Sequence, residues 1–254
     1  MTKMVKDIRK IAYERYVSKH FTSFHNLDMI RIEYEKTYLW VKEHLLRFIN
    51  HLKKHSKILD IGCGLGHHIY AFKKLGFSNV LGVDISPECV EFCKQQGFNV
   101  VQADIFDFLS DCEEKFDLII AFDFIEHLTV EEGYLLAKLI LRCLNPTGLF
   151  IMNVPNANNI LKLRERYMDI THKTIYTPES IKELLLLAGF KRVIVIGVKP
   201  FSTMDTNIYR KLFKKMIALP IYRISLLILK LLYHSTGMFD VTILDPKMLV
   251  VGEK

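Results

Sequence analysis

The sequence lacks the marks of a secreted or disulfide-stabilised protein. Its N-terminus, MTKMVKDIRKIAYERYVSKH, alternates charged with apolar residues and contains no unbroken apolar core of a signal peptide. The cysteines form an odd set without a repeating framework, namely Cys63, Cys89, Cys93, Cys112 and Cys143. Such a set predicts reduced thiols and a cytoplasmic location. Cys89 and Cys93 can share a helix face, but no second Cys or His pair completes a zinc site, so we expect them in the core.

Long uncharged runs and acidic residues are scarce near the C-terminus. Between Pro200 and Gly237, six Lys or Arg residues stand against a single Asp, which holds most of the excess in the formal charge of +7. The stretch from Tyr209 to Tyr233 is apolar, but Arg223 and Lys230 interrupt it, so we expect it not to span a bilayer. It favours a helix, broken at Pro220, that contacts an anionic membrane on the inner face as a peripheral segment. Packing on the chain's own core or in a homodimer is the alternative, and no groove-like pattern suggests nucleic acid.

The rest of the chain predicts one α/β domain. It has 254 residues, half of them hydrophobic, which is enough to bury a substantial core. From Lys57 onward, short β-branched runs alternate with helical patterns, as is typical of parallel α/β units. Helix ends are marked by the pairs Gly76-Phe77, Gly97-Phe98 and Gly189-Phe190, and helix starts by the capping residues Ser86, Thr129 and Thr177. The predicted strands are Lys57 to Ile61, Val80 to Val83, Val100 to Ala103, Leu118 to Phe122, Leu149 to Asn153, Arg192 to Ile196 and Met248 to Gly252.

This alternation divides the chain into four segments. Residues 1–54 look helical, and we expect them to pack on the sheet or to cover the site as a lid. Residues 55–198 form the core, residues 199–246 a basic helical insertion, and residues 247–254 the last strand. The apolar stripe of the first segment consists of Tyr38, Val41, Leu45, Phe48, Ile49 and Leu52.

The chemistry begins at the stretch ILDIGCGLGHH. A short apolar strand ends there in Asp60 and breaks into Gly62, Gly64 and Gly66. Without side chains, such a turn can present backbone amides to a ligand at the carboxyl edge of the sheet. The dinucleotide fingerprint GxGxxG needs its third glycine where His67 stands, so NAD and FAD are poor candidates. A P-loop needs Lys followed by Ser or Thr after the glycines, which excludes nucleoside triphosphates as well.

Acidic residues end the next two strands. Asp84 can accept both hydroxyl groups of a ribose, and Asp104 can accept a hydrogen bond from an exocyclic amine. Ile85 and Ile105 follow them as apolar walls for a purine ring. Carboxylates at strand ends are often only caps or solvated turn residues, but three in register behind a DxGxGxG turn favour a ligand site. An adenosine with an aminoacyl tail fits this set.

Four motifs together resemble those of the class I S-adenosylmethionine (SAM)-dependent methyltransferases. They are DIGCGLG, GVDIS, QADIF and FDLIIAFDFIEHL, in this order, over roughly residues 57–196. The resemblance implies a Rossmann-like seven-stranded sheet, mostly parallel with an antiparallel last strand, and helices on both faces. It also implies SAM as cofactor, with Asp84 at the ribose, Asp104 at the adenine and Asp123 near the sulfonium. The full expected set is Asp60, Gly62, Cys63, Gly64, Gly66, Asp84, Ile85, Asp104, Ile105 and Asp123, in which Asp60 and the glycine backbone face the methionine moiety.

A second cluster follows the fourth strand in AFDFIEHLT. Asp123, Glu126 and His127 are spaced to project to one side of a helical turn. Methyl transfer to a hydroxyl group needs a base, so His127 is the first candidate, with Glu126 beside it. The same three side chains could instead bind Mg, Mn or Zn. The pattern is similar to the ExxEH cluster of the ubiquinone-pathway O-methyltransferases, although Asp123 replaces the first Glu. Alternatively, Glu126 and His127 only cap the helix that begins near Thr129.

A later loop, YMDITHKTIYTPESIKELLLLAGF, contains Asp169, His172 and Tyr176. Loops of this kind lie above the carboxyl edge and often contact substrate, so His172 is a second candidate base, a substrate ligand or a loop-stabilising residue. The stretch resembles the THxxxYTxxSL segment of methyltransferases from bacterial surface-polysaccharide and related glycolipid pathways. The amide-rich stretch NVPNANN, residues 153–159, suits sugar hydroxyls, and is also ordinary loop chemistry.

The sequence therefore predicts a SAM-dependent O-methyltransferase. The favoured acceptor is a carbohydrate or lipid-linked saccharide of surface glycan or glycolipid biosynthesis. The alternatives are an O-methyltransferase of a small phenolic or quinone-like metabolite, and a SAM-binding module without catalysis that partners another enzyme.

Overall fold

The computed structural model describes residues 27–162, 167–199, 208–238 and 240–254. The first 26 residues of the predicted N-terminal segment therefore lie outside the described residues, as does the start of the late insertion.

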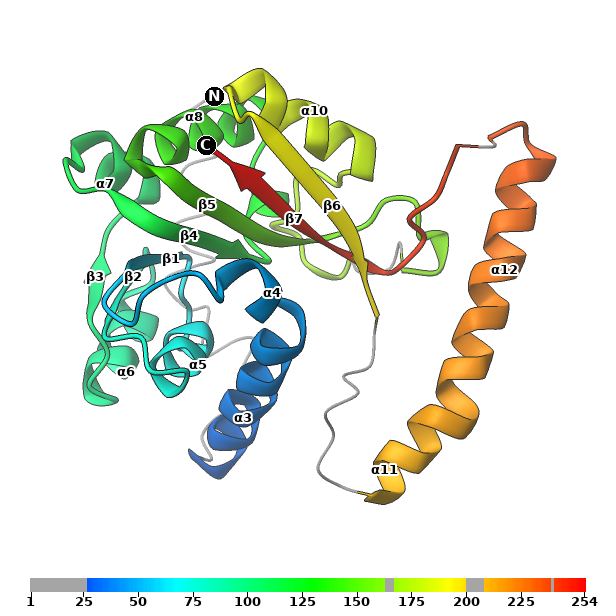
Figure 1. Ribbon diagram of the computed structural model, residues 1–254, viewed down its shortest axis with the longest axis horizontal. Coiled ribbons are helices and arrows are strands. Elements are labelled where there is room, and N and C mark those ends of the chain that lie inside the picture. The colour runs from blue at the N-terminus through cyan, green and yellow to red at the C-terminus, as the bar shows by residue number, and fades with distance from the viewer. Residues whose placement is uncertain (1–26, 163–166, 200–207, 239) are drawn as a thin grey trace.

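A seven-stranded sheet forms the centre of the molecule, in the order β3-β2-β1-β4-β5-β7-β6 (Figure 1). Strand β7 runs antiparallel to both of its neighbours, β5 and β6, whereas β1 to β5 pair in parallel. The predicted fold, with its antiparallel last strand, is confirmed. The strands are β1 Lys57–Ile61, β2 Asn79–Asp84, β3 Val100–Gln102, β4 Phe116–Phe122, β5 Leu144–Pro155, β6 Arg192–Val198 and β7 Lys247–Glu253.

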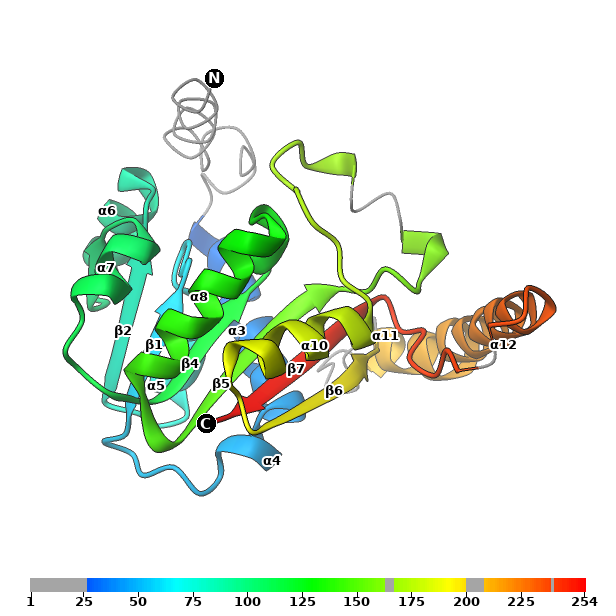
Figure 2. The ribbon, with the colours of Figure 1, turned by 90° about the horizontal axis from the view of Figure 1, so that it is seen from above.

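Helices cover both faces of the sheet and enclose two apolar clusters (Figure 2). One face packs against α7 Ile105–Asp111, α8 Val130–Cys143 and α10 Pro178–Ala188. The other packs against α3 Leu27–His44, α4 Leu46–Ile49, α5 His67–Lys74 and α6 Pro87–Gln95. Short 3-10 turns, η1 Ile125–His127 and η2 Ile160–Lys162, follow β4 and β5. Because helices cover both faces of the sheet, a ligand can reach the strands only at an edge of the sheet.

The local signals in the sequence set the helix boundaries. Ser86 accepts a hydrogen bond from the Cys89 amide, and Thr129 with Glu132 forms a reciprocal capping box at the start of α8. Thr177 caps α10, and the glycine of each predicted Gly-Phe pair has a positive φ angle. All five cysteines are free thiols, and Cys89 and Cys93 are buried as expected.

The described part of the N-terminal segment packs on the sheet. Its stripe is directed inward, with Val41, Leu45 and Ile49 fully buried against the second apolar cluster. Helix α3 also packs beside α5, the helix that directly follows the glycine turn (Figure 1). It is thus part of the wall of the predicted site.

The late insertion differs from the expectation in two ways. Helix α11 Ile208–Phe213 continues through a π-helical turn, η3 Lys214–Ala218, into α12 Leu219–Ser235, so the helix is not broken at Pro220. The wider π turn lets the chain pass a proline, which has no N–H and crowds the carbonyl four residues before it. The span Lys214–Ser235 also contains an 18-residue window with a mean hydropathy of 1.7, so by length and composition alone it could cross a membrane, although Arg223 and Lys230 lie within the span.

Candidate active site

The carboxyl ends of adjacent parallel strands bring the predicted site residues to one edge. Strands β2, β1 and β4 are neighbours in the sheet, and they end near Asp84, Asp60 and Asp123. Asp104 follows β3, the next strand outward. Residues from four separate parts of the chain therefore meet at the carboxyl edge, where open α/β sheets bind their ligands.

Gly64 of the glycine turn opens onto free space, whereas Gly62 and Gly66 pack against Phe124 and Phe98. Gly62, Gly64 and Gly66 have φ angles of +66°, +51° and +77°, which residues with a side chain rarely adopt. A methyl group added to Gly64 would meet no atom within 4 Å, so this position opens onto free space. The amides of Gly62 and Cys63 donate to the Val83 carbonyl, that of Gly64 to Asp84, and that of Gly66 to the Cys63 carbonyl. These four amides already donate to acceptors within the protein, so the expectation that they donate to a ligand is wrong for Gly62, Cys63, Gly64 and Gly66.

Asp60 is the strongest ligand-directed group at this edge. It is 1% exposed, and its Oδ2 atom has no hydrogen-bond partner. Burial, and after it the nearby charge of Asp84, raises the pKa of Asp60 well above its ordinary value. A buried acceptor without a partner is costly, and a cationic ligand would both satisfy it and favour its ionised form.

Asp84 and Asp104 each accept hydrogen bonds from backbone amides at the carboxyl edge of the sheet. Asp84 accepts hydrogen bonds from the Gly64 and Ser86 amides, both at 2.8 Å, and burial nevertheless raises its pKa. Asp104 caps α7 by accepting from the Phe106 amide at 2.8 Å. Of the two predicted apolar walls, Ile85 is 40% exposed and Ile105 is buried. A carboxylate oxygen has two lone pairs, so these backbone bonds leave acceptor capacity for a ligand.

Asp123 occupies a strained position at the tip of β4. Among the described residues it alone combines a side chain with a positive φ angle, +49°. Its amide donates to the Asn153 carbonyl, and its carboxylate pairs with Lys247 at 2.6 Å. A left-handed conformation costs free energy in any residue with a side chain, and such positions cluster at functional sites.

Glu126, His127 and His172 form one side-chain cluster beyond β4. Their ligand atoms all lie within 4.8 Å of one another, and the rings of the two histidines meet edge to face with centroids 4.7 Å apart. Glu126 is 2% exposed, and burial, followed by the Asp123 charge, raises its pKa to about 8. Burial, followed by the His172 charge, lowers the pKa of His127 to about 4. At neutral pH, His127 is therefore uncharged and Glu126 retains its proton.

A chain of hydrogen bonds orients the His127 ring. Thr171 donates its hydroxyl to Asp169 at 2.6 Å, so its oxygen is left to accept from Nδ1 of His127 at 2.7 Å. Burial raises the pKa of Asp169, but the hydroxyl and amide hydrogen bonds from Thr171 outweigh it and lower the pKa overall. These donor and acceptor roles put the ring proton of neutral His127 on Nδ1 and the lone pair on Nε2. Figure 1 places this loop near the end of β5 and the start of β7.

Residues 33–194 match the family model described as a methyltransferase domain. This span is more than half of the chain and contains strands β1 to β5 with the residues at their carboxyl ends. The chain belongs to this methyltransferase family.

Curated methyltransferases with different acceptors in their names are similar to this chain. One is the phosphoethanolamine N-methyltransferase of Plasmodium falciparum, 30% identical over 151 residues, or 56% of each protein. Another is the ubiquinone biosynthesis O-methyltransferase of Bartonella bacilliformis, 28% identical over 159 residues, or 56% of this chain and 62% of the relative. The chain thus spans little more than half of the length of these relatives.

Solved methyltransferases share the fold. A SAM-dependent methyltransferase from Archaeoglobus fulgidus superposes with a TM-score of 0.61 at 24% identity, over 85% of this chain and 94% of that one. Magnesium protoporphyrin IX methyltransferase from Synechocystis, with bound S-adenosylhomocysteine (SAH), gives 0.60 at 12% identity, over 98% and 99%. SAM is the cofactor of this methyltransferase, and the partnerless Asp60 oxygen and the open space at Gly64 fit a cationic nucleoside.

Tyr34 is a residue of the methyltransferase site that the sequence analysis missed. Its hydroxyl donates to the Leu65 carbonyl inside the glycine turn at 2.6 Å, and its ring stacks on Tyr70 with centroids 4.7 Å apart. The available signal was the helical spacing of Ile30, Tyr34 and Tyr38, which extends the recognised stripe backward. Through this bond, Tyr34 ties the glycine turn to helix α3.

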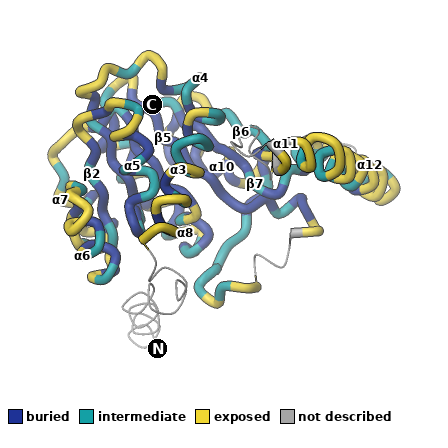
Figure 3. The backbone as a smooth tube through the Cα atoms, turned by 90° about the horizontal axis from the view of Figure 1, so that it is seen from below, coloured by how far each residue is buried: buried dark blue, intermediate teal, exposed yellow. Residues whose placement is uncertain are grey.

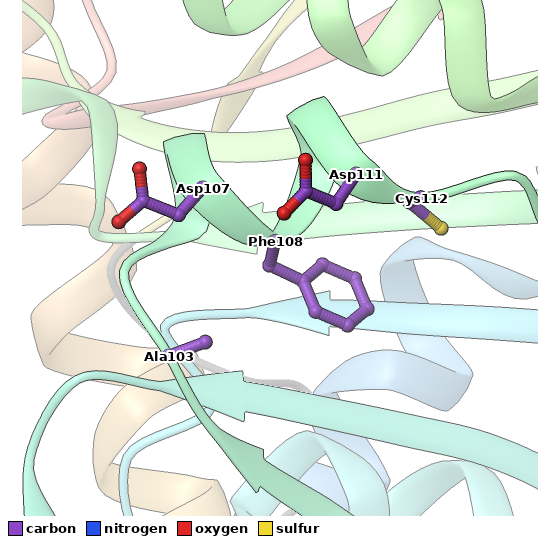
Figure 4. Close-up of a pocket in the computed structure, with 5 residues that line it drawn as sticks. All are labelled: Ala103, Asp107, Phe108, Asp111 and Cys112. Carbon is purple, nitrogen blue, oxygen red and sulfur yellow. The ribbon is translucent and has the colours of Figure 1, made fainter.

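A surface hollow of about 360 Å³ lies beside α7 but contains none of the predicted cofactor residues. Figure 4 shows Asp107, Phe108, Asp111 and Cys112 of this region with Ala103 below them. Asp107 and Asp111 would repel an anionic ligand, and no residue of the glycine turn lines the hollow. The methyltransferase site is therefore assigned to the glycine turn and not to this hollow.

The cluster that could bind a metal differs from the predicted one. The expected set was Asp123, Glu126 and His127, but the structure groups Glu126 and His127 with His172, while Asp123 pairs with Lys247. The capping alternative is wrong, because Thr129 and Glu132 cap α8 themselves. The backbone carbonyl of Glu126 instead accepts the amides of Lys173 and Thr174, which ties the later loop to this cluster.

The amides of NVPNANN are largely used within the protein. Asn156 donates to the Ile243 and Asp245 carbonyls, and Asn159 donates to Leu244. These bonds fasten the segment that leads into β7. Asn153, beside Asp123, keeps a buried side-chain oxygen without a partner.

Proposed function

We propose that this methyltransferase transfers the methyl group of SAM to a hydroxyl oxygen, with a carbohydrate or lipid-linked saccharide as acceptor. The observation that carries the proposal is the hydrogen-bond chain from Asp169 through Thr171 to His127, next to the buried Glu126. An orienting carboxylate, a hydroxyl relay and an imidazole with its lone pair on Nε2 are the parts of a general base. A hydroxyl acceptor needs such a base because it must lose a proton as it is methylated.

When bound, SAM supplies an electrophilic methyl group on a positively charged sulfur. The acceptor oxygen forms a bond to the methyl carbon as the sulfur–carbon bond breaks, and the electron pair of that bond stays on sulfur to give SAH. His127 Nε2 takes the hydroxyl proton. Glu126 lies within 4.8 Å of the His127 ligand atoms, and above about pH 8, where it is ionised, its carboxylate stabilises the imidazolium that results.

The acceptor class is supported by residues around this base. The His172 stretch resembles the corresponding segment of surface-polysaccharide methyltransferases, and the partnerless Asn153 oxygen can accept from a sugar hydroxyl. The runner-up acceptor is a small phenol or quinone-like metabolite, which the likeness to the ubiquinone biosynthesis O-methyltransferase supports. A more acidic phenol makes less demand on the base.

A divalent metal held by Glu126, His127 and His172 is a second way to activate the hydroxyl. Two imidazoles and a carboxylate within 4.8 Å are a competent donor set, and Glu126 Oε2 has no other partner. The ion would lower the pKa of the acceptor hydroxyl in place of a base.

Matched variants of the relay test the proposal. The purified chain is assayed with methyl-labelled SAM against lipid-linked glycans, nucleotide sugars and catechols, and SAM affinity is measured by calorimetry. Thr171→Val removes the hydroxyl and is expected to lower kcat about 10- to 100-fold with SAM affinity unchanged, whereas Thr171→Ser keeps the relay and most of the rate.

Each other outcome has a defined meaning. Equal rates for the Val and Ser variants would remove the relay from the mechanism. Activity that chelators abolish and added Mn²⁺ restores would favour the metal. If no acceptor is methylated while SAM binds tightly, the chain is a SAM-binding module that partners another enzyme.

A further inference from the structure

Helix α12 is a largely exposed apolar helix. It stands apart from the sheet in Figures 1 and 2 and is largely exposed in Figure 3. Only 6% of its most apolar window is buried, and Leu229 is its only buried residue. An exposed apolar surface of this extent marks an interaction site in a folded protein.

The exposed apolar residues form one continuous stripe. Ile221, Ile224, Ile228 and Leu231 follow one another at spacings of three and four, and each is more than half exposed. Arg223 and Lys230, seven residues apart, flank this stripe on one side.

The opposite side of the helix contacts the catalytic domain. Tyr222 donates its hydroxyl to Asp245, Leu229 is buried, and Tyr233 donates to the Asn158 carbonyl at 2.9 Å. These three positions share a second stripe, in which Tyr222 and Tyr233 lie eleven positions apart, or about 16 Å along the helix. The helix is therefore held lengthwise along the domain, with its apolar stripe directed away from it.

Charge decides between the occupants of the stripe. No Asp or Glu lies between Asp205 and Asp240, whereas Lys214, Lys215, Arg223 and Lys230 all do. A second copy of the helix would bring the same cations against each other without acidic partners. Anionic lipid headgroups supply the missing charge, and each cation near them contributes about 1 kcal/mol.

We propose that α12 docks lengthwise in the surface of an anionic bilayer, with its apolar stripe among the acyl chains. The contacts at Tyr222 and Tyr233 argue against spanning, because a helix that crossed the bilayer would draw the attached domain into the hydrocarbon. Asp245, the partner of Tyr222, lies two residues before Lys247, which pairs with Asp123, so α12 is attached beside the start of β7, close to the reacting edge. The proposal is independent of the acceptor's identity.

Vesicle flotation tests the docking with the full chain and two matched double variants. Ile224→Asp with Ile228→Asp places charge in the stripe, and Leu135→Asp with Leu187→Asp places the same charge at exposed apolar positions of α8 and α10. The stripe variant is expected to lose binding to phosphatidylcholine–phosphatidylglycerol vesicles about tenfold or more, and the control variant to bind like the wild type. Equal binding of the two variants would overturn the proposal.

The role of charge is tested in the same flotation assay, and the topology and the oligomeric state are tested in two further assays. Arg223→Gln with Lys230→Gln is expected to lower affinity for the phosphatidylglycerol vesicles roughly 30-fold, from about 1 kcal/mol for each charge, with little effect on pure phosphatidylcholine. Protein that stays in membranes after alkaline carbonate extraction would show a spanning helix and contradict docking. Dimerisation in analytical ultracentrifugation that the stripe variant abolishes, without vesicle binding, would assign the stripe to a second copy and overturn the proposal.

Discussion

Replacing Gly64 by Ala separates the space that SAM needs from the strain that the backbone bears. Gly64 and Gly97 both have positive φ angles, +51° and +74°, and a methyl group on either would meet no protein atom within 4 Å. Gly64 lies in the glycine turn, whereas Gly97 ends α6 away from the ligand edge. The two positions therefore share the conformational cost of a side chain and differ only in whether the ligand is expected there.

The magnitudes follow from this comparison. A left-handed alanine costs about 1–2 kcal/mol, and the lower entropy of its unfolded chain returns about 0.4–1 kcal/mol. We therefore expect Gly64→Ala and Gly97→Ala to lose about 1 kcal/mol of stability each, or about 2–4 °C in Tm by calorimetry. Only Gly64→Ala places a methyl group against the bound nucleoside, and overpacking of about 1–3 kcal/mol lowers SAH affinity about tenfold or more.

Titration calorimetry with SAH and thermal unfolding of both variants provide the assay. Stability losses that match, together with a SAH affinity that falls only in Gly64→Ala, are the expected result. If Gly64→Ala binds SAH as tightly as the wild type while its Tm drops, the open space at Gly64 is not part of the nucleoside site, and the reasoning is refuted.

Three further variants test the charges and caps. Asp60→Asn is expected to weaken SAM binding about 10- to 100-fold, because it removes a charged hydrogen bond. Wild-type SAM affinity should rise with pH as the Asp60 carboxyl ionises, and titrations of the variant at several pH values should show no such rise. Unchanged affinity would exclude Asp60 from the site. Glu126 has a pKa raised from 4.5 to about 8, so the folded state keeps a proton that the unfolded state has lost, and stability falls as pH rises through this window. The Tm of Glu126→Gln should therefore fall less than that of the wild type between pH 5 and 8. Its methylation rate should also lack the rise near pH 8 that ionisation of Glu126 causes in the wild type. If the variant keeps this rise, another group is responsible for it. Thr177→Ala removes the α10 cap and should lower stability by about 1 kcal/mol without changing SAM affinity, whereas a loss of affinity would show that α10 is coupled to the site.

The fold could be predicted where a short stretch of sequence decides its own structure. The alternation of apolar runs set the seven strands, and Ser86, Thr129 and Thr177 set helix starts because a hydroxyl cap bonds only to amides two or three residues away. The order of the motifs along the chain predicted the carboxylates at the sheet edge, since parallel strands end at a common edge.

Contacts between distant segments could not be predicted in this way. The Asp123–Lys247 pair joins residues 124 positions apart, and the Thr171 relay to His127 joins residues 44 apart. The bonds of the glycine-turn amides to Val83 and Asp84 likewise depend on how β1 and β2 pair. A local pattern shows which residues can form hydrogen bonds, but not which distant residues become their partners in the fold.

Titration of the purified full chain with SAH, and with NAD and ATP in parallel, tests the central claim most directly. The account predicts saturable heat with SAH, and none with NAD or ATP. Saturable binding of NAD or ATP by a chain that ignores SAH would contradict it.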